Sequence, residues 1–307
     1  MDVTSYLLGK QAGGGGGQPS LQNKSVTITE NGTQNVTADT GYDGLNNVSI
    51  TTNVAGGGGL DWSAIGYSGT PQVITNGYNY SKNIYDNWNN TQTSLRMKFA
   101  DDIDLIYMPL VDTSNATRAD GMFLRCSSLQ YCPALDLSNC HETFSDMFSS
   151  CLSLREVGLL DISNATSVGS MFNNCQVLKT IPLLNISNAT RTDGMFNQCV
   201  NLISIPQLNI SNATRTDSMF YGCLKLETVP ELHPTKAVNM NNMFYNCKKL
   251  TDDSLNNILK TCTNATTYAG TKTLVYMGFN ASNYPASRIQ ALPYYQDFLN
   301  AGWTIGY

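Results

Sequence analysis

The stretch that decides the fold is MFNNCQVLKTIPLLNISNAT, residues 171–190. Four of its apolar residues are spaced so that they can share one interior, and they are Leu178, Ile181, Leu184 and Ile186. Leu184 and Ile186 are two positions apart, which places both side chains on one face of an extended segment. A unit this short buries little apolar surface alone, so it needs neighbours of the same kind.

Such neighbours are present, because the stretch recurs along the chain. Met-Phe pairs begin at residues 122, 147, 171, 195, 219 and 243, and a cysteine follows each methionine by four positions. Self-similarity with a period of about 20 to 29 residues is typical of leucine-rich-repeat solenoids. The sequence therefore predicts a repeat solenoid of six leucine-rich-repeat-like copies. We expect a parallel β-sheet on one face of it and short helices or turns on the other.

A polar column lies between the two inward apolar columns of the predicted sheet. With strands about 4.8 Å apart, it would form an outward stripe about 24 Å long. We take it as the candidate ligand-binding face; its members are Asp112, Asp136, Asp161, Asn185, Asn209 and, in the divergent sixth copy, His233.

The Met-Phe-x-x-Cys-x-x-Leu core, followed by Ser-Asn-Ala-Thr, resembles the BspA-type leucine-rich repeats of bacterial and phage surface proteins. The resemblance covers about residues 105 to 250. Two copies depart from it. The second reads Ser-Asn-Cys-His at 138–141 with one inserted residue, and the sixth reads His-Pro-Thr-Lys at 233–236.

Glycine runs at 13–17 and 56–59 divide the N-terminal fifth of the chain and are typical of flexible tethers. Between them, alternating residues around Asn31-Gly32 predict a β-hairpin, with a further strand at 48–51. The expected organisation is an anchoring segment with its tether at 1–19, a small β-module at 20–55, a glycine linker at 56–59, an N-terminal aromatic cap at 60–104, the six repeats at 105–250 and an α+β C-terminal cap at 251–307.

The aromatic residues before the array have two readings. They can form the core of a capping unit, or they can form an aromatic ligand platform, and the candidates for the platform are Tyr78, Tyr80, Tyr85 and Trp88. After the array, we expect a helix that is N-capped by Asp252 or Asp253, a last strand at 274–277, and a helical stretch around 289–299 that is broken or started by Pro293. The apolar face of the first helix would be Leu255, Ile258, Leu259 and Cys262.

The composition of the chain argues against several classes of function. Net charge is -5 and charged residues make up 13% of the chain, which argues against a duplex nucleic-acid partner. No apolar run is long enough to predict a membrane span, and the first ten residues do not predict a secretory signal peptide. Six of the nine cysteines recur once per copy in apolar surroundings, which predicts buried, unpaired thiols and no zinc site. We expect no cofactor, no metal and no catalytic residues.

The opening residues MDVTSYLLGK and the glycine run after them look like the start of structural proteins of phages that infect Gram-positive hosts. The β-module at 24–54 is similar to short modules of those proteins. The resemblance implies a virion protein of the tail, baseplate or fibre type, made in the host cytoplasm. It would be anchored to other virion proteins by an N-terminal segment that includes Val3, Tyr6, Leu7 and Leu8.

The expected function is non-enzymatic attachment to a host-surface glycan or protein. Three alternatives are a head fibre or decoration protein with a structural or weak glycan-binding role, a bacterial BspA-like adhesin, and a wall-degrading enzyme. The number of copies in an assembly stays open, because no heptad pattern predicts a trimeric stalk and a homo-oligomer is compatible with the sequence.

Overall fold

A computed structural model describes residues 26–28, 34–36, 49–50, 72–73, 88, 91–108 and 111–307. The chain divides into two units, residues 1–83 and residues 84–307. In the first unit, strand β1 (Val26–Ile28) pairs antiparallel with β2 (Gln34–Val36) on either side of the predicted Asn31-Gly32 turn. Strand β3 (Ser49–Ile50) pairs in parallel with β4 (Gln72–Val73).

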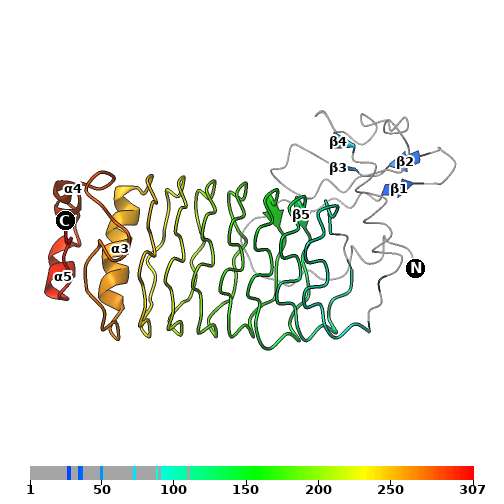
Figure 1. Ribbon diagram of the computed structural model, residues 1–307, viewed down its shortest axis with the longest axis horizontal. Coiled ribbons are helices and arrows are strands. Elements are labelled where there is room, and N and C mark those ends of the chain that lie inside the picture. The colour runs from blue at the N-terminus through cyan, green and yellow to red at the C-terminus, as the bar shows by residue number, and fades with distance from the viewer. Residues whose placement is uncertain are drawn as a thin grey trace. The chain divides into compact units, whose positions relative to one another are not determined.

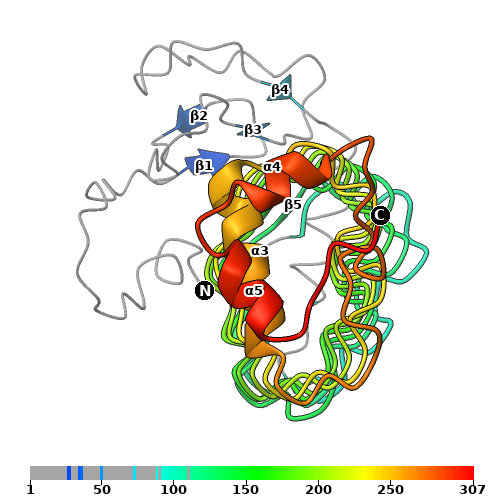
Figure 2. The ribbon, with the colours of Figure 1, turned by 90° about the vertical axis from the view of Figure 1, so that its left-hand side faces the viewer.

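The second unit is a stack of coils, each about 24 residues long, that run side by side from residue 91 towards the C-terminus (Figure 1). Seen along the stack, the coils superpose on one another around a common interior (Figure 2). One phenylalanine per coil forms a continuous stack inside. Adjacent ring centroids are 5.2 to 5.6 Å apart and adjacent planes lie within 13°, through Phe99, Phe123, Phe148, Phe172, Phe196, Phe220 and Phe244.

Phe99 lies in the range expected to form the N-terminal cap. Residues around it nevertheless make a coil of the same kind, since Leu95 N donates to Arg118 O at 2.8 Å and Phe99 N donates to Met122 O at 2.9 Å. The stack therefore begins one coil before the first Met-Phe pair.

The Met-Phe segments are held by two alternating sets of backbone hydrogen bonds. Gly194 N and Phe196 N donate forward to Asp217 O and Met219 O of the next coil, while the N–H between them, on Met195, donates back to Thr192 O. Two residues per coil have a positive φ, which bends the chain tightly here. One column of them is Gly121, Asp146, Ser170, Gly194, Ser218 and Asn242, and the other is Arg125, Ser150, Asn174, Gln198, Gly222 and Asn246.

On the side of the polar column, neighbouring coils form less β-pairing than a continuous parallel sheet, which the sequence predicted, would have. In the described repeats it consists of the parallel pair β5 (Tyr131–Cys132) and β6 (Glu156–Val157), together with isolated bridges such as Leu135 to Leu160 and Ser204 to Thr228. Proline accounts for part of this difference because it has no N–H to donate. One stands on this side of several copies, at 133, 182, 206 and 230.

Helix α3 (Asp252–Asn264) follows the last Met-Phe coil, and α4 (Ala286–Gln290) and α5 (Tyr295–Asn300) come after it. The predicted apolar face of α3 is confirmed, because Leu255, Ile258, Leu259 and Cys262 are all buried. The polar residues of α3 bond the backbone of the last coil. Ser254 Oγ accepts from Val229 N at 3.0 Å and Thr261 Oγ1 accepts from Leu232 N at 3.0 Å.

Two expectations for this end of the chain are wrong. The N-cap of α3 is Thr251, whose hydroxyl accepts from Ser254 N, so Asp252 and Asp253 lie in the first turn, where their charges favour the helix dipole. Residues 274–277 form turns and no strand. The reason is that they add one more rung to the stack, in which Phe244 N donates to Met277 O at 2.8 Å.

None of the helices in the described ranges is both long and apolar enough to cross a lipid bilayer.

Candidate binding surfaces

The polar column predicted as a binding face is outward, but one side-chain oxygen of each of its aspartates and asparagines accepts hydrogen bonds within its own turn. Asp136 Oδ1 accepts from the backbone N–H of Ser138 at 3.2 Å and from its hydroxyl at 2.7 Å. The same pair of bonds, an Asx turn, recurs in the other copies that have serine two positions later. These acceptors are Asp112, Asp161, Asn185 and Asn209.

His233 does not continue that pattern. It is exposed, and its Nε2 lies 3.8 Å from Glu231 Oε1. The following Pro234 replaces the usual serine-containing turn, and Thr235 N donates to His233 O at 2.9 Å. The structure thus brings five of the six predicted residues into one repeated arrangement whose evident role is to hold a turn.

Beside the polar column, a ladder of asparagine and threonine side chains joins each coil to the one before. Asn188 Nδ2 donates to Ser163 O at 2.9 Å, and Thr190 Oγ1 donates to Thr166 O at 3.1 Å. Equivalent amide bonds are made by Asn139, Asn164 and Asn212. The recurrent Asn-Ala-Thr is therefore explained by the structure of the turn.

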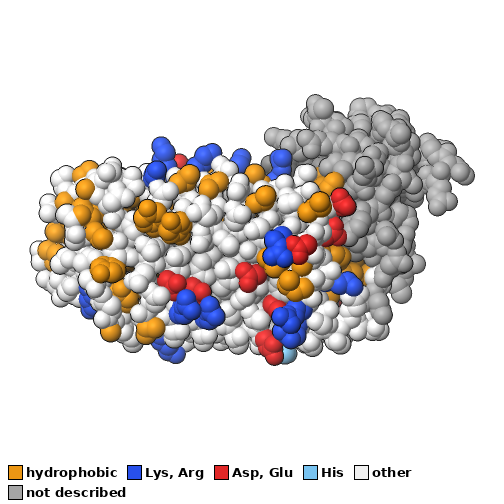
Figure 3. Space-filling model, in the orientation of Figure 1, with side chains coloured by type: hydrophobic (Ala, Val, Ile, Leu, Met, Phe, Trp, Pro, Cys, Tyr) orange, Lys and Arg blue, Asp and Glu red, His pale blue; other side chains and the backbone are white. Residues whose placement is uncertain are grey.

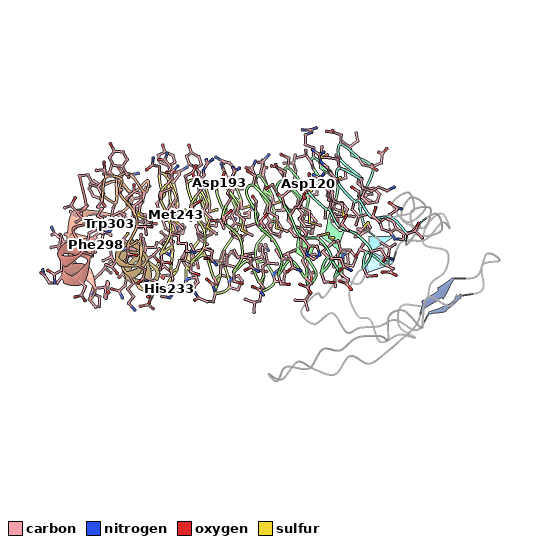
Figure 4. The ribbon with its side chains drawn as sticks, turned by 90° about the horizontal axis from the view of Figure 1, so that it is seen from below. Asp120, Asp193, His233, Met243, Phe298 and Trp303 are labelled. Carbon is pink, nitrogen blue, oxygen red and sulfur yellow. The ribbon has the colours of Figure 1, made fainter. Side chains whose placement is uncertain are left out.

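Arginine and aspartate side chains form mixed charge groups along one edge of the coils. Arg191 contacts Asp193 through two nitrogens, at 3.0 and 2.9 Å, and Arg215 Nη2 approaches the same carboxylate from the next coil at 3.7 Å. Burial would raise the pKa of Asp193, but the two guanidinium groups outweigh it and hold that pKa below its ordinary value. In Figure 4, Asp120 and Asp193 lie on one side of the stack and His233 on the other. The face drawn in Figure 3 likewise carries charges in small groups of both signs.

The prediction of buried, unpaired thiols is confirmed, since all nine cysteines are free and buried. Cys199 Sγ donates to Phe172 O of the preceding coil at 3.0 Å, and the five other repeat cysteines make the same bond. Burial raises the pKa of Cys126 and of Cys199 to about 12, which disfavours the reactive thiolate. In the described part of the chain, no three His, Cys, Asp or Glu residues are grouped to hold a metal ion.

Of the four aromatic candidates, Trp88 is described, whereas Tyr78, Tyr80 and Tyr85 lie outside the described residues. The Trp88 ring stacks against Phe99 with centroids 6.5 Å apart, and its Nε1 donates to Asp112 O at 2.7 Å. These contacts continue the phenylalanine stack and fit the capping reading of this residue. The predicted anchoring residues Val3, Tyr6, Leu7 and Leu8 also lie outside the described residues.

One aromatic feature is absent from the sequence prediction. Tyr221 and Tyr245 stack with ring centroids 4.7 Å apart and planes at 17°, and Tyr245 is 41% exposed. Their separation of 24 residues equals the repeat period, so the period alone could have identified them as neighbours on the surface. Near them, Asn241, Asn242, Val275 and Tyr276 line a shallow hollow of about 320 Å³.

Residues 139–258 match a family model described as "Mycoplasma protein of unknown function, DUF285", and this segment covers most of the repeat array and the start of α3. No curated protein matches the chain.

Proposed function

We propose that this protein is a non-enzymatic display protein. Its stacked coils, which we assign to the leucine-rich-repeat class, present their outer surface to a glycan or protein on a host cell. Its N-terminal segment attaches it to other proteins of a phage particle, so that its location is the virion. No nucleic acid, membrane span, metal or cofactor enters this proposal.

The observation that carries the proposal is that the thiol, carboxylate and guanidinium groups of the coils are engaged in contacts within the protein. The thiols donate to backbone carbonyls, the carboxylates of the polar column hold serine turns, and Arg191 and Arg215 face aspartates. The thiol bond joins one coil to the preceding one, whereas the carboxylate bonds hold a turn within a single coil. This supports a structural and binding role over catalysis, because general acids, bases and nucleophiles need to be free to react with a substrate.

The attachment of the N-terminus rests on the resemblance of residues 1–10 and 24–54 to phage structural proteins. Within that segment, Val3, Tyr6, Leu7 and Leu8 supply the apolar contacts for anchoring. A short apolar segment that docks into an assembly buries these side chains against the partner.

Two measurements on the full chain test the proposal. Gold-labelled antibodies raised against residues 111–307 should mark particles released from lysed Gram-positive cultures that make this protein, and a fluorescent form of the protein should bind intact host cells in flow cytometry. Replacing Val3, Tyr6, Leu7 and Leu8 together by serine should abolish incorporation into particles and leave cell binding unchanged.

Labelling of tails supports the attachment role, and labelling of capsids supports the head-fibre alternative. The proposal is refuted if particles carry no label and host cells bind no protein. Release of soluble fragments from host cell walls by the purified protein would support the enzymatic alternative.

A further inference from the structure

Exposed aromatic surface in the described part of the chain collects near the end of the stack. Three aromatic side chains there are exposed, Tyr245 (41%), Tyr276 (49%) and Tyr307 (38%). Tyr245 belongs to the stacked pair with Tyr221, and Tyr276 lines the hollow. We call Tyr221, Tyr245, Tyr276, Asn241 and Asn242 the tyrosine shelf.

Backbone contacts join the two parts of the tyrosine shelf. Tyr245 N donates to Asn242 O at 3.0 Å, and Asn242 N donates to Tyr276 O at 2.6 Å. The Tyr268 hydroxyl donates to Asn241 Oδ1 at 3.4 Å, which orients that amide. The stacked rings and the hollow are therefore parts of one surface, which is built on three consecutive rungs.

Glycine ends the tyrosine column and leaves Tyr245 partly uncovered. A β-carbon added to Gly278 would lie only 2.4 Å from Tyr245 Cα, so this glycine of the last rung lies directly against the Tyr245 backbone. It has no side chain with which to cover the ring. The φ of Gly278 is 95°, a conformation that favours glycine.

The charge groups of earlier coils stop before the tyrosine shelf. Arg215 and Asp217 pair with each other in one coil, and the equivalent positions 24 residues later are Asn239 and Asn241. The side chains that define the shelf are thus phenols and amides. Such a surface combines flat apolar area with hydrogen-bonding groups and has no charge of its own to attract an ion.

We infer that the tyrosine shelf binds a neutral glycan. The apolar C–H faces of sugar rings can pack on the tyrosine rings, and the sugar hydroxyls can bond the amides and the phenolic groups. The inference rests on the proposed function and makes it more specific. It moves the contact surface from the polar column to the C-terminal end of the repeat array, and it gives the chemical class of the ligand.

The test uses the full chain on an array of immobilised oligosaccharides, of which one set is neutral (hexose and N-acetylhexosamine chains) and the other acidic (uronic-acid and sialylated chains). We expect binding to neutral glycans, and we expect it to persist in high salt because no ion pair contributes to it. The neutral oligosaccharide that binds most strongly is then titrated calorimetrically against the variants.

Tyr245→Ala should weaken this binding by roughly tenfold, as expected when an aromatic contact is lost from a binding site. Asn242→Asp should weaken it too, because it removes an amide donor; aspartate tolerates the φ of 55° at this position, so the fold is kept. Leu183→Ala is the matched control. It removes a side chain that is 65% exposed elsewhere on the stack, and it should leave affinity unchanged.

Binding to acidic glycans alone, binding to no glycan, or equal affinity of Tyr245→Ala and the parent protein would each overturn the inference. Whole-cell binding separates this failure from that of the proposed function. If Tyr245→Ala still binds cells as well as the parent does, the tyrosine shelf is not the glycan-binding surface, and the proposal that the protein attaches to host cells is unaffected. If the parent protein binds no cells, attachment itself fails.

Discussion

The phenylalanine stack predicts that Phe172→Leu is costly although it keeps an apolar side chain in the core. The Phe172 ring is fully buried between Phe148 and Phe196, with centroid distances of 5.4 and 5.6 Å and planes within 3°. A stacked aromatic pair contributes about 0.5–1.5 kcal/mol beyond the burial of its area. Losing two such pairs should lower the free energy of unfolding by about 1–3 kcal/mol. Phe172→Ala, which also leaves a cavity, should lower it by about 3–5 kcal/mol.

The stack also predicts which pairs of substitutions are coupled. In a double-mutant cycle, Phe172→Leu and Phe196→Leu should show a coupling energy of about 0.5–1.5 kcal/mol, because the two rings are in contact. Phe172→Leu and Phe220→Leu act two coils apart, with the Phe196 ring between them. Their effects should add to within about 0.5 kcal/mol.

Guanidinium unfolding followed by circular dichroism measures these energies, with Leu183→Ala as the surface control, expected within about 0.5 kcal/mol of the parent. The reasoning is refuted if Phe172→Leu costs no more than Leu183→Ala. It is also refuted if the pair two coils apart is coupled as strongly as the adjacent pair.

Three further predictions concern the thiols, the asparagine ladder and the charge groups. Ellman's reagent at pH 8 should leave the nine cysteines of the native protein essentially unmodified and should react with all of them after denaturation. The reason is that burial raises the pKa values of the thiols, as at Cys199 to about 12. Rapid reaction of the thiols in the native protein would contradict this. Asn188→Ala breaks an amide bond between coils and should lower the free energy of unfolding by about 0.5–1.5 kcal/mol in chemical denaturation; an unchanged midpoint would show that the bond adds nothing. The pKa of Asp193 is lower in the folded chain than in the unfolded one, so its ionised form stabilises the fold above the ordinary carboxyl range and this contribution is lost as pH falls through the lowered pKa. Asp193→Asn should therefore cost at most about 1 kcal/mol at pH 7 and nothing in strong acid, and a cost that grows as pH falls would contradict the assignment.

The period of the Met-Phe pairs was sufficient to predict which residues are buried together. A residue type that recurs every 24 positions in an apolar context must lie in a column, and the phenylalanine and cysteine columns follow from that rule. The extra coil around Phe99 was missed because lysine precedes this phenylalanine and aspartate stands at the cysteine position, so that the motif is incomplete there.

Candidate site residues were harder to predict, because a side chain that faces outward can still be hydrogen-bonded within the protein and so be unavailable to a ligand. Asp136 and Asp161 face outward as expected, yet one carboxylate oxygen of each, Oδ1, accepts from a serine two positions later. The signal was present in the sequence, since Asp-x-Ser is an Asx-turn pattern. The wrong strand at 274–277 has another cause: its turns depend on the register of a rung more than 30 residues away, which local alternation of residues cannot indicate.

The hydrogen bonds between coils give the stack a direction. The side-chain donors Asn188, Thr190 and Cys199 all reach the preceding coil, whereas Gly194 N and Phe196 N reach the following one. Reversing the rod end for end would therefore not reproduce its surface. A polymer whose two ends differ, if it lay along several coils, would therefore bind in one orientation.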